Sequence, residues 1–153
     1  VISGYGSTND ASHETSPHAT GQWYEAAVAR ALADAGTTAR QTDYWNMHGT
    51  GTALNDAAEA HVASKLVGDS VPIGSTKPLT GHCLGATGAI EAILCSLAIT
   101  EGLIPPSVNS APLDPELPVL DIADTARPAS VERVLTTSLG FGGHNAALVL
   151  EAA

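Results

Sequence analysis

Segments rich in β-branched and apolar residues alternate along this chain with Ala-rich segments, and two of the former follow each other at its end. Strands are expected at Val1–Thr8, Asp43–Met47, Val71–Ser75, Arg133–Ser138 and Asn145–Glu151. Helices are expected at Gln22–Ala35, at Asp56–Val67, and from the Gly-rich stretch Thr80–Gly88 to about Glu101. Strands that alternate with helices build a sheet covered by helices. The alternation therefore predicts an α/β fold with a largely parallel sheet and a C-terminal antiparallel hairpin joined by Gly140–His144.

Within each expected helix, apolar residues recur at the spacing of one helix face, which predicts the residues of the core. These residues are Trp23, Ala27 and Ala31 in the first helix, Ala60, Ala63 and Val67 in the second, and Ala86, Ile90, Ile93 and Leu97 in the third. The segment 102–118 holds five of the nine prolines and is expected to be an extended connector.

The composition excludes several classes of function. Sixteen acidic and six basic residues give a net charge of −10, whereas a nucleic-acid-binding protein needs a basic surface. No apolar run is expected to approach the length of a membrane span, and no signal peptide is recognisable. The two cysteines, Cys83 and Cys95, fit a reducing compartment. We expect a cytoplasmic protein with neither nucleic-acid nor membrane partners.

Two histidines lie in Gly-rich turns that flank the expected strands and helices. His48 follows a strand in HGTGT, and His82 precedes a helix, five residues after Lys77. Turns at the carboxyl ends of strands line the ligand crevice of such a sheet, so both rings are expected in one pocket. A nearby cation keeps an imidazole neutral, and two neutral N–H donors suit an enolate or oxyanion. An ordinary structural role for both rings is weighted equally.

Other candidate sites are weaker. A polar loop combines two histidines with two acids, namely Asp10, His13, Glu14 and His18, but their spacing matches no closed zinc pattern, and we expect no metal. The stretch 81–88 lacks the Gly-Lys-Ser/Thr ending of a phosphate-binding loop. Cys83 is expected to be a small buried residue rather than a nucleophile. Asp56 and Glu59 are interpreted either as solvated helix acids or, for Glu59, as a group that orients the surroundings of His48.

Four motifs together resemble one family. They are Tyr44–Thr52 (YWNMHGTGT), Ser75–Gly88 (STKPLTGHCLGATG), Ile104–Asn109 (IPPSVN) and Thr137–Asn145 (TSLGFGGHN). In this order and spacing, the chain resembles the C-terminal half of β-ketoacyl-acyl-carrier-protein synthases, the elongating condensing enzymes of the thiolase fold. The resemblance implies a mixed, mostly parallel five-stranded sheet with layered helices. It also implies that residues 1–153 form the C-terminal domain, without the N-terminal half that carries the family's nucleophilic cysteine.

The resemblance implies catalytic roles for four side chains. His48 and His82 resemble the two active-site histidines that donate hydrogen bonds to the malonyl thioester carbonyl and stabilise the enolate. Lys77 resembles the lysine that supports the second histidine, and Glu59 resembles the buried acid near that lysine. A histidine at position 82 is typical of the elongating class, because the initiating condensing enzymes carry asparagine there.

Three further residues resemble binding positions of the family. Thr50 and Thr52 match positions that hydrogen-bond the phosphopantetheine arm, and Phe141 matches the gatekeeping residue whose backbone N–H helps to hold an oxyanion. The chain departs from the frequent family residues at Ala53, Asn55, Leu139 and His144. The Asn55-Asp56 pair, where Gly is frequent at the first position, is more similar to ketosynthases of aromatic polyketide or aryl-polyene pathways.

The activity implied is decarboxylation of malonyl-acyl carrier protein and its condensation with an acyl thioester, in fatty-acid or polyketide synthesis. The implied partners are an acyl carrier protein, the N-terminal half or a partner chain that supplies the cysteine, and a second subunit in a homo- or heterodimer. No cofactor is expected beyond the phosphopantetheine of the carrier protein. Two alternatives stay open: a non-catalytic partner of the chain-length-factor type, and a coenzyme A-dependent acyltransferase of the thiolase type.

Overall fold

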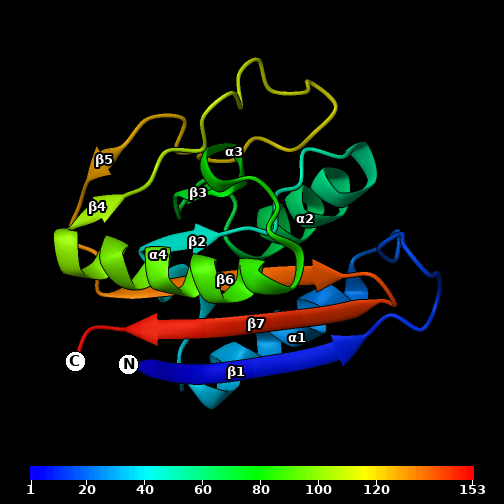
Figure 1. The fold of residues 1–153 in the computed structure, drawn as a ribbon, viewed down its shortest axis with the longest axis horizontal. Coiled ribbons are helices and arrows are strands. Elements are labelled where there is room, and N and C mark those ends of the chain that lie inside the picture. Colours follow the sequence, from blue (N-terminus) through cyan, green and yellow to red (C-terminus); the bar gives the residue numbers. More distant parts are fainter.

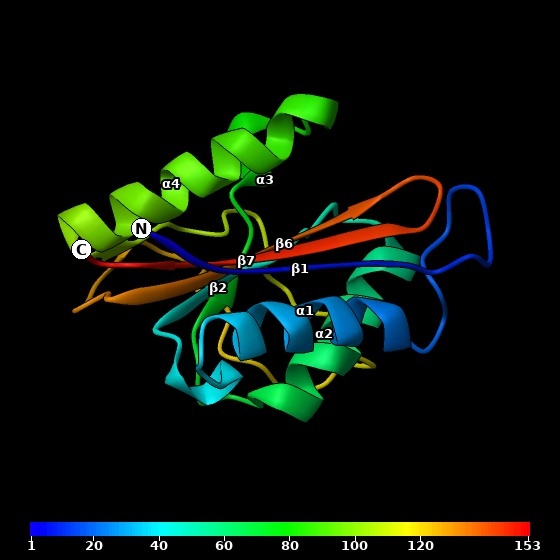
Figure 2. The ribbon, with the colours of Figure 1, turned by 90° about the horizontal axis from the view of Figure 1, so that it is seen from below.

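A central sheet of five strands separates two layers of helices in the computed structural model, which describes all 153 residues (Figure 1, Figure 2). The strands lie in the order β1 (Ile2–Asn9), β7 (His144–Glu151), β6 (Arg133–Gly140), β2 (Tyr44–Asn46) and β3 (Ile73–Gly74). Helices α1 (Gln22–Asp34) and α2 (Ala53–Leu66) cover one face, and α4 (Thr87–Glu101) lies on the other (Figure 2). The short elements are η1 (Ala39–Gln41), α3 (Lys77–Thr80), η2 (Leu84–Ala86), β4 (Leu103–Ile104) and β5 (Arg127–Pro128).

The sheet is mixed, as predicted. Strand β2 runs parallel to β3 and β6, whereas β7 runs antiparallel to β6 and to β1. Two of the four pairings are therefore parallel, and the predicted hairpin of β6 and β7 is interior because β1 pairs with its outer side. Gly4 and Gly6 of β1 lie close to the backbone of α1, since a Cβ at either position would lie within 2.2 Å of a backbone oxygen of that helix. The two glycines let α1 pack directly against β1.

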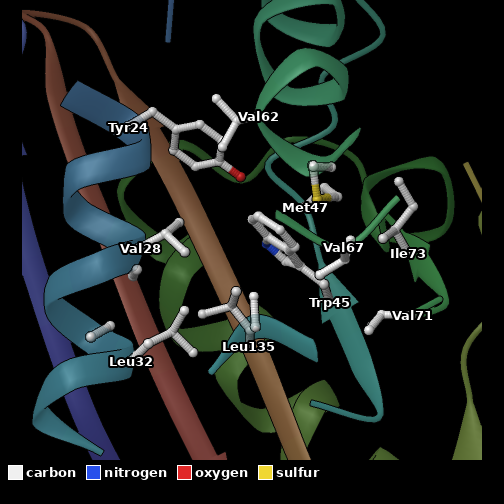
Figure 3. Packing of buried hydrophobic residues seen from close by; sticks show 14 of the residues in the cluster. Tyr24, Val28, Leu32, Trp45, Met47, Val62, Val67, Val71, Ile73 and Leu135 are labelled. Carbon is white, nitrogen blue, oxygen red and sulfur yellow. The ribbon is translucent and has the colours of Figure 1, made fainter. Parts of the chain in front are cut away.

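The larger core cluster has 17 buried residues and fills the space between the sheet and helices α1 and α2 (Figure 3). Trp45 of β2 lies near its middle, with its ring centroid 6.3 Å from that of Tyr24. The predicted core residues Ala27, Ala31, Ala60, Ala63 and Val67 are all buried, which confirms the inner faces of these two helices. The prediction is wrong for Trp23, whose side chain is 41% exposed in the first turn of α1.

Helix α4 turns a different face to the sheet from the one predicted. Ile93 and Leu97 are 61% and 48% exposed, Ala86 is exposed, and Ile90 is only half-buried. The buried residues of α4 are Thr87, Glu91, Cys95 and Ala98. Because α4 is apolar on nearly every side, the spacing of its apolar residues did not identify the inner face. The buried face is fixed by Glu91, whose carboxylate meets a cation of α3.

The apolar stretch that contains α4 is longer than the sequence analysis expected for any apolar run of this chain. By length and composition, the stretch Leu84–Glu101 is long and apolar enough to cross a membrane, so the prediction that no run approaches this length is wrong. Alanine, glycine and threonine between the larger apolar residues extend the run. Such a test is also passed by core helices of water-soluble proteins, and Glu91 lies in the middle of this one.

The observed bounds of the helices and strands lie close to the predicted ones, with three differences. Helix α2 begins at Ala53, three residues before the expected start, and the one-turn helix α3 precedes the Gly-rich stretch. The Pro-rich connector is largely irregular, as expected, but it contains β4, which pairs with β5 further along the chain to form a small second sheet. The two-residue strands are too short for periodicity to reveal them.

Candidate functional site

The turn after β2 places His48 at the carboxyl end of the sheet. Gly49 follows with a φ of +48°, and a Cβ there would lie 2.4 Å from Cβ of Ser75, so only glycine fits this close approach. The backbone N–H groups of His48 and Gly49 donate to the two carboxylate oxygens of Glu59, at 2.8 and 2.7 Å. The carboxylate of α2 thereby holds the turn that carries the histidine.

The rings of His48 and His82 lie together, as predicted. Their centroids are 5.4 Å apart, and the ring planes make an angle of 86°. Burial lowers the pKa of His48 to about 3, with smaller contributions from the positive charge of Lys77 and from His82. The imidazole of His48 is therefore neutral at physiological pH, and its buried Nδ1 has no hydrogen-bond partner within the chain.

The hydrogen bonds of His82 fix its tautomer. The backbone N–H of Leu84 donates to Nδ1 of His82 at 3.2 Å, which makes Nδ1 an acceptor. The Oγ1 atom of Thr87 lies 3.1 Å from the same nitrogen and can donate its hydroxyl proton there. In the neutral ring the proton consequently sits on Nε2, which is available as a donor to a bound group.

Lys77 forms a buried ion pair with Glu91. Its Nζ lies 2.6 Å from Oε1 of Glu91, and the two side chains are 5% and 1% exposed. Burial raises the pKa of Glu91, and the hydrogen bond and charge of Lys77 oppose this rise. Sequence reasoning missed Glu91 and expected Glu59 as the acid near the lysine. The signal that could have revealed Glu91 is a lone acid in the middle of an otherwise apolar helix.

Glu59 orients the backbone around His48, which is the second of its two interpretations. Besides the two backbone donors, its Oε2 accepts a hydrogen bond from the side-chain amide of Asn55 at 2.7 Å, and the hydroxyl of Tyr24 donates to Oε1 at 3.4 Å. Burial raises the pKa of Glu59 to about 7, although the hydrogen bonds from Gly49, Asn55 and His48 lower it. The carboxyl group thus titrates near neutral pH.

Five of the predicted site residues line one cavity of about 970 Å³ between the turns: His48, Thr50, Thr52, His82 and Phe141. The hydroxyl oxygens of Thr50 and Thr52 lie 3.0 Å apart. Glu59 and Lys77 line a second cavity of about 650 Å³, which extends beneath the Pro-rich connector. Thr50 and His82 border both cavities. The seven residues therefore line two cavities that adjoin each other at Thr50 and His82.

The turn between β6 and β7 carries Phe141, whose side chain is 76% exposed. This turn lies beside the loop after β1 (Figure 1). Backbone N–H groups of Asp10 and Gly142 donate to carbonyls of Gly143 and Glu14, at 2.8 and 2.7 Å, and Asn145 Nδ2 donates to Oδ1 of Asp10 at 2.7 Å. Sequence reasoning missed the part that Asp10 and Asn145 play in holding the turn.

The remaining candidates have other roles in the structure. Nδ1 of His13 accepts hydrogen bonds from two backbone N–H groups of its own loop, and no group of three or more His, Cys, Asp or Glu side chains is arranged to hold a metal ion. Burial raises the pKa of Cys95 to about 12, so this thiol stays protonated. Cys83 is exposed, so its expected burial is wrong: it directly precedes η2, in a stretch whose residues 81–86 are all exposed.

Comparison with known proteins assigns the family. Residues 1–111 match the family model described as the C-terminal domain of β-ketoacyl synthases. The chain is 39% identical to 3-oxoacyl-[acyl-carrier-protein] synthase 2 of Staphylococcus aureus, over 98% of this chain and 38% of that protein. The enzyme of the same name from Synechocystis sp. is 38% identical over 97% of this chain and 36% of that protein. The chain belongs to the β-ketoacyl synthase family.

Solved structures of β-ketoacyl synthases agree with this assignment. The ketosynthase ApeO of Xenorhabdus doucetiae, in complex with its chain length factor ApeC, matches with a TM-score of 0.94 and 39% identity, over 99% of this chain and 39% of that chain. A type II PKS ketosynthase in complex with its acyl-carrier protein, AntDE:AntF, matches with a TM-score of 0.91 and 32% identity, over 99% and 38%. The resemblance and the thiolase-like fold are thereby confirmed. The chain spans somewhat over a third of the length of these relatives.

Proposed function

We propose that the protein containing this chain is a condensing enzyme that decarboxylates malonyl-acyl carrier protein and joins the product to an acyl thioester. The observation that carries the proposal is the pair of imidazoles of His48 and His82, whose ring centroids lie 5.4 Å apart in one cavity, with His48 held neutral by its burial. N–H donors that are fixed in position before the reaction stabilise an oxyanion strongly, because they need no reorganisation when charge develops.

The proposed reaction begins with loss of carbon dioxide from the malonyl group. The electron pair of the breaking C–C bond passes into the thioester, which becomes an enolate whose oxygen accepts hydrogen bonds from His48 and His82. The Lys77–Glu91 pair stabilises this arrangement, because the charge of Lys77 opposes protonation of the neighbouring His48. Thr50 and Thr52 are proposed to hold the phosphopantetheine arm at the mouth of the cavity.

The carbanion then attacks the carbonyl carbon of an acyl group held as a thioester on a cysteine. The new C–C bond forms, the thiolate of that cysteine leaves, and the product is a 3-oxoacyl-acyl carrier protein. The backbone N–H of Phe141 is proposed to bind the tetrahedral oxyanion. The cysteine is proposed to come from the N-terminal half of the enzyme or from a partner chain, because Cys95 remains protonated and Cys83 lines neither cavity.

The outward face of α4 supports such a partner segment. Ile93 and Leu97, one turn apart, form an exposed apolar stripe on this helix, and Leu84 of η2 is exposed as well. An apolar helix face of this kind requires apolar neighbours to become stable in water. We propose that the N-terminal half of the synthase, carrying the cysteine, packs here. A homo- or heterodimer is proposed as well, in line with the relative that binds a chain length factor.

Further parts of the proposal concern the carrier protein and the location. With a net charge of −10 this chain offers little attraction to an acidic carrier protein, so the basic docking surface is proposed to lie on the remainder of the synthase. Phosphopantetheine of the carrier protein is the only prosthetic group that the proposal requires. The expected cytoplasmic location and the absence of metal stay predictions.

The test measures release of carbon dioxide from malonyl-acyl carrier protein by the intact protein. We expect His82→Ala and His48→Ala each to lower this rate by about 10²–10³, the typical effect of removing one oxyanion donor. His61→Ala, at an exposed position of α2, is the matched control and should leave the rate unchanged. Normal release by His82→Ala would refute the proposed role. A wild-type protein without decarboxylation would instead favour the non-catalytic, chain-length-factor type.

A further inference from the structure

Glu59 is a buried carboxylate that no cation neutralises. Its side chain is 2% exposed, and none of the four ion pairs of the chain includes it. The groups that face it are neutral or negative: two backbone N–H groups of the turn at His48, the hydroxyl of Tyr24 from α1, and the side chains of Asn55 and Asp56 from its own helix. A buried charge in such surroundings depends on its hydrogen-bond donors.

Asn55 supplies the only side-chain amide to this carboxylate. It is 5% exposed in the first turn of α2, with Nδ2 at 2.7 Å from Oε2 of Glu59 and at 3.0 Å from Oδ1 of Asp56. One amide group therefore donates to two neighbouring carboxylates. Without it, the negative charge of Asp56 would act on Glu59 with one fewer compensating donor, which favours protonation of Glu59.

The protonation state of Glu59 decides how the turn is held. An ionised carboxylate accepts hydrogen bonds at both oxygens, which satisfies the N–H groups of His48 and Gly49 together. A protonated carboxyl group carries an O–H on one oxygen, and that oxygen then opposes one of the two N–H donors. One of the two bonds that hold the backbone of the His48–Gly49 turn is weakened in that state, because a hydroxyl oxygen accepts less strongly than a carboxylate oxygen.

We propose that Asn55 is a positioning residue, whose amide keeps Glu59 in the ionised form that fixes the His48–Gly49 turn. The inference rests on the proposed function, since it assigns Asn55 to the support of a catalytic histidine. The pKa of Glu59 supports it independently: burial raises this pKa to about 7, and Asn55 is among the groups that lower it. Loss of the amide would leave Glu59 protonated at pH 7.

The main test is Asn55→Leu, which keeps a similar volume and removes the amide. Malonyl decarboxylation by the intact protein is followed from pH 6 to pH 9.5, and kcat and KM are determined separately. We expect the acidic limb of the kcat profile to move to higher pH by about one unit or more. A hydrogen bond to a charged group stabilises the charge by an amount that corresponds to at least about one pKa unit. At pH 7 kcat should fall about fivefold or more with little change in KM, and it should recover at high pH.

Two controls separate this effect from a general loss of structure. Ala57→Leu introduces the same side chain at an exposed position of α2 and should leave the profile unchanged. Asn55→Ser retains a shorter hydroxyl donor, so its acidic limb should move less than that of Asn55→Leu. A loss of kcat in Asn55→Leu that is equal at every pH would indicate a merely structural role and overturn the inference.

Infrared titration of the protonated carboxyl band provides a readout that does not depend on activity. The band that disappears in Glu59→Gln belongs to Glu59, and its midpoint should lie at higher pH in Asn55→Leu than in the wild type. Equal midpoints would overturn the inference. If the wild-type protein shows no decarboxylation, the proposed function fails while this titration still decides the role of Asn55.

Discussion

On one face of the sheet lie α1 and α2, and on the other face α4 is the only helix of more than one turn (Figure 2). Between the sheet and α1 and α2, large side chains such as Trp45 and Leu135 are fully buried within a cluster of 17 residues (Figure 3). The cluster that includes Cys95 of α4 has seven residues, while Ile93 and Leu97 face outward. One face is complete within this chain, whereas the other has apolar surface left over for a further layer.

Each side of the centre also contains a buried glutamate, and the two are stabilised in different ways. Glu59 of α2 accepts hydrogen bonds from neutral donors, and burial raises its pKa to about 7. Glu91 of α4 forms an ion pair with Lys77. Neutral donors leave a carboxyl group that changes charge near neutral pH, whereas a buried cation binds its partner as a charge. Glu59 therefore changes its charge near neutral pH, whereas Glu91 stays charged as the partner of Lys77.

The largest expected effect comes from breaking the ion pair on the α4 side. Glu91→Ala leaves Lys77 buried without a partner and should lower the free energy of unfolding by about 3–5 kcal/mol. Urea unfolding of the intact protein measures the change. The double variant Lys77→Met/Glu91→Leu removes both charges and should recover most of this stability, yet it should not recover decarboxylation. An unchanged free energy of unfolding in Glu91→Ala would show that the ion pair does not stabilise the fold.

A smaller effect is expected from the outward face of α4. Ile93→Lys places a charge on the apolar stripe and should lower the free energy of unfolding of the intact protein by at least about 2 kcal/mol, if the proposed partner segment covers this face. The matched control is Ala29→Lys at an exposed position of α1, which should change stability by less than about 0.5 kcal/mol. Equal and small effects of both variants would mean that the face of α4 stays open to water.

The effect that is smallest in each single measurement, about 1 kcal/mol for each pH unit, concerns the glutamate of α2. Because burial raises the pKa of Glu59 from its usual 4.5 to about 7, the folded protein holds its proton more tightly than the unfolded chain. The free energy of unfolding should therefore fall, by at most about 1 kcal/mol per pH unit from this group, as the pH rises from 4.5 to 7. Glu59→Gln should remove this slope whatever its effect on absolute stability. Urea unfolding at several pH values measures it, and parallel curves for both proteins would contradict the raised pKa.

The sequence predicted the two histidines well because glycine-rich turns mark the ends of strands. His48 and His82 are 34 positions apart, and their meeting at one edge of the sheet follows from the expected order of strands and helices. The inner residues of α1 and α2 were predictable for a similar reason, since apolar residues occupy only one side of these helices. In α4 the same method chose Ile93 and Leu97, which are exposed, because apolar residues surround that helix.

The spacing of apolar residues could not predict contacts between polar side chains that are far apart in the sequence. Glu91 lies 14 positions from Lys77, and nothing in the spacing of apolar residues distinguishes it from a solvated acid. The hydrogen bond from Asn145 to Asp10 joins residues 135 positions apart, and it exists because β1 and β7 are neighbours in the sheet. Strand order had to be known before either contact could be found.

By itself, the sequence determined the α/β class, the turns that carry His48, His82 and Phe141, and the membership of a family whose motifs are local. Local motifs are legible because glycine-rich turns depend on backbone conformations that few other residues adopt. Tertiary structure alone decided which face of α4 is buried, which acid pairs with Lys77, and which groups surround Glu59. These outcomes depend on burial and on donors contributed by other elements, and both arise only when the layers pack.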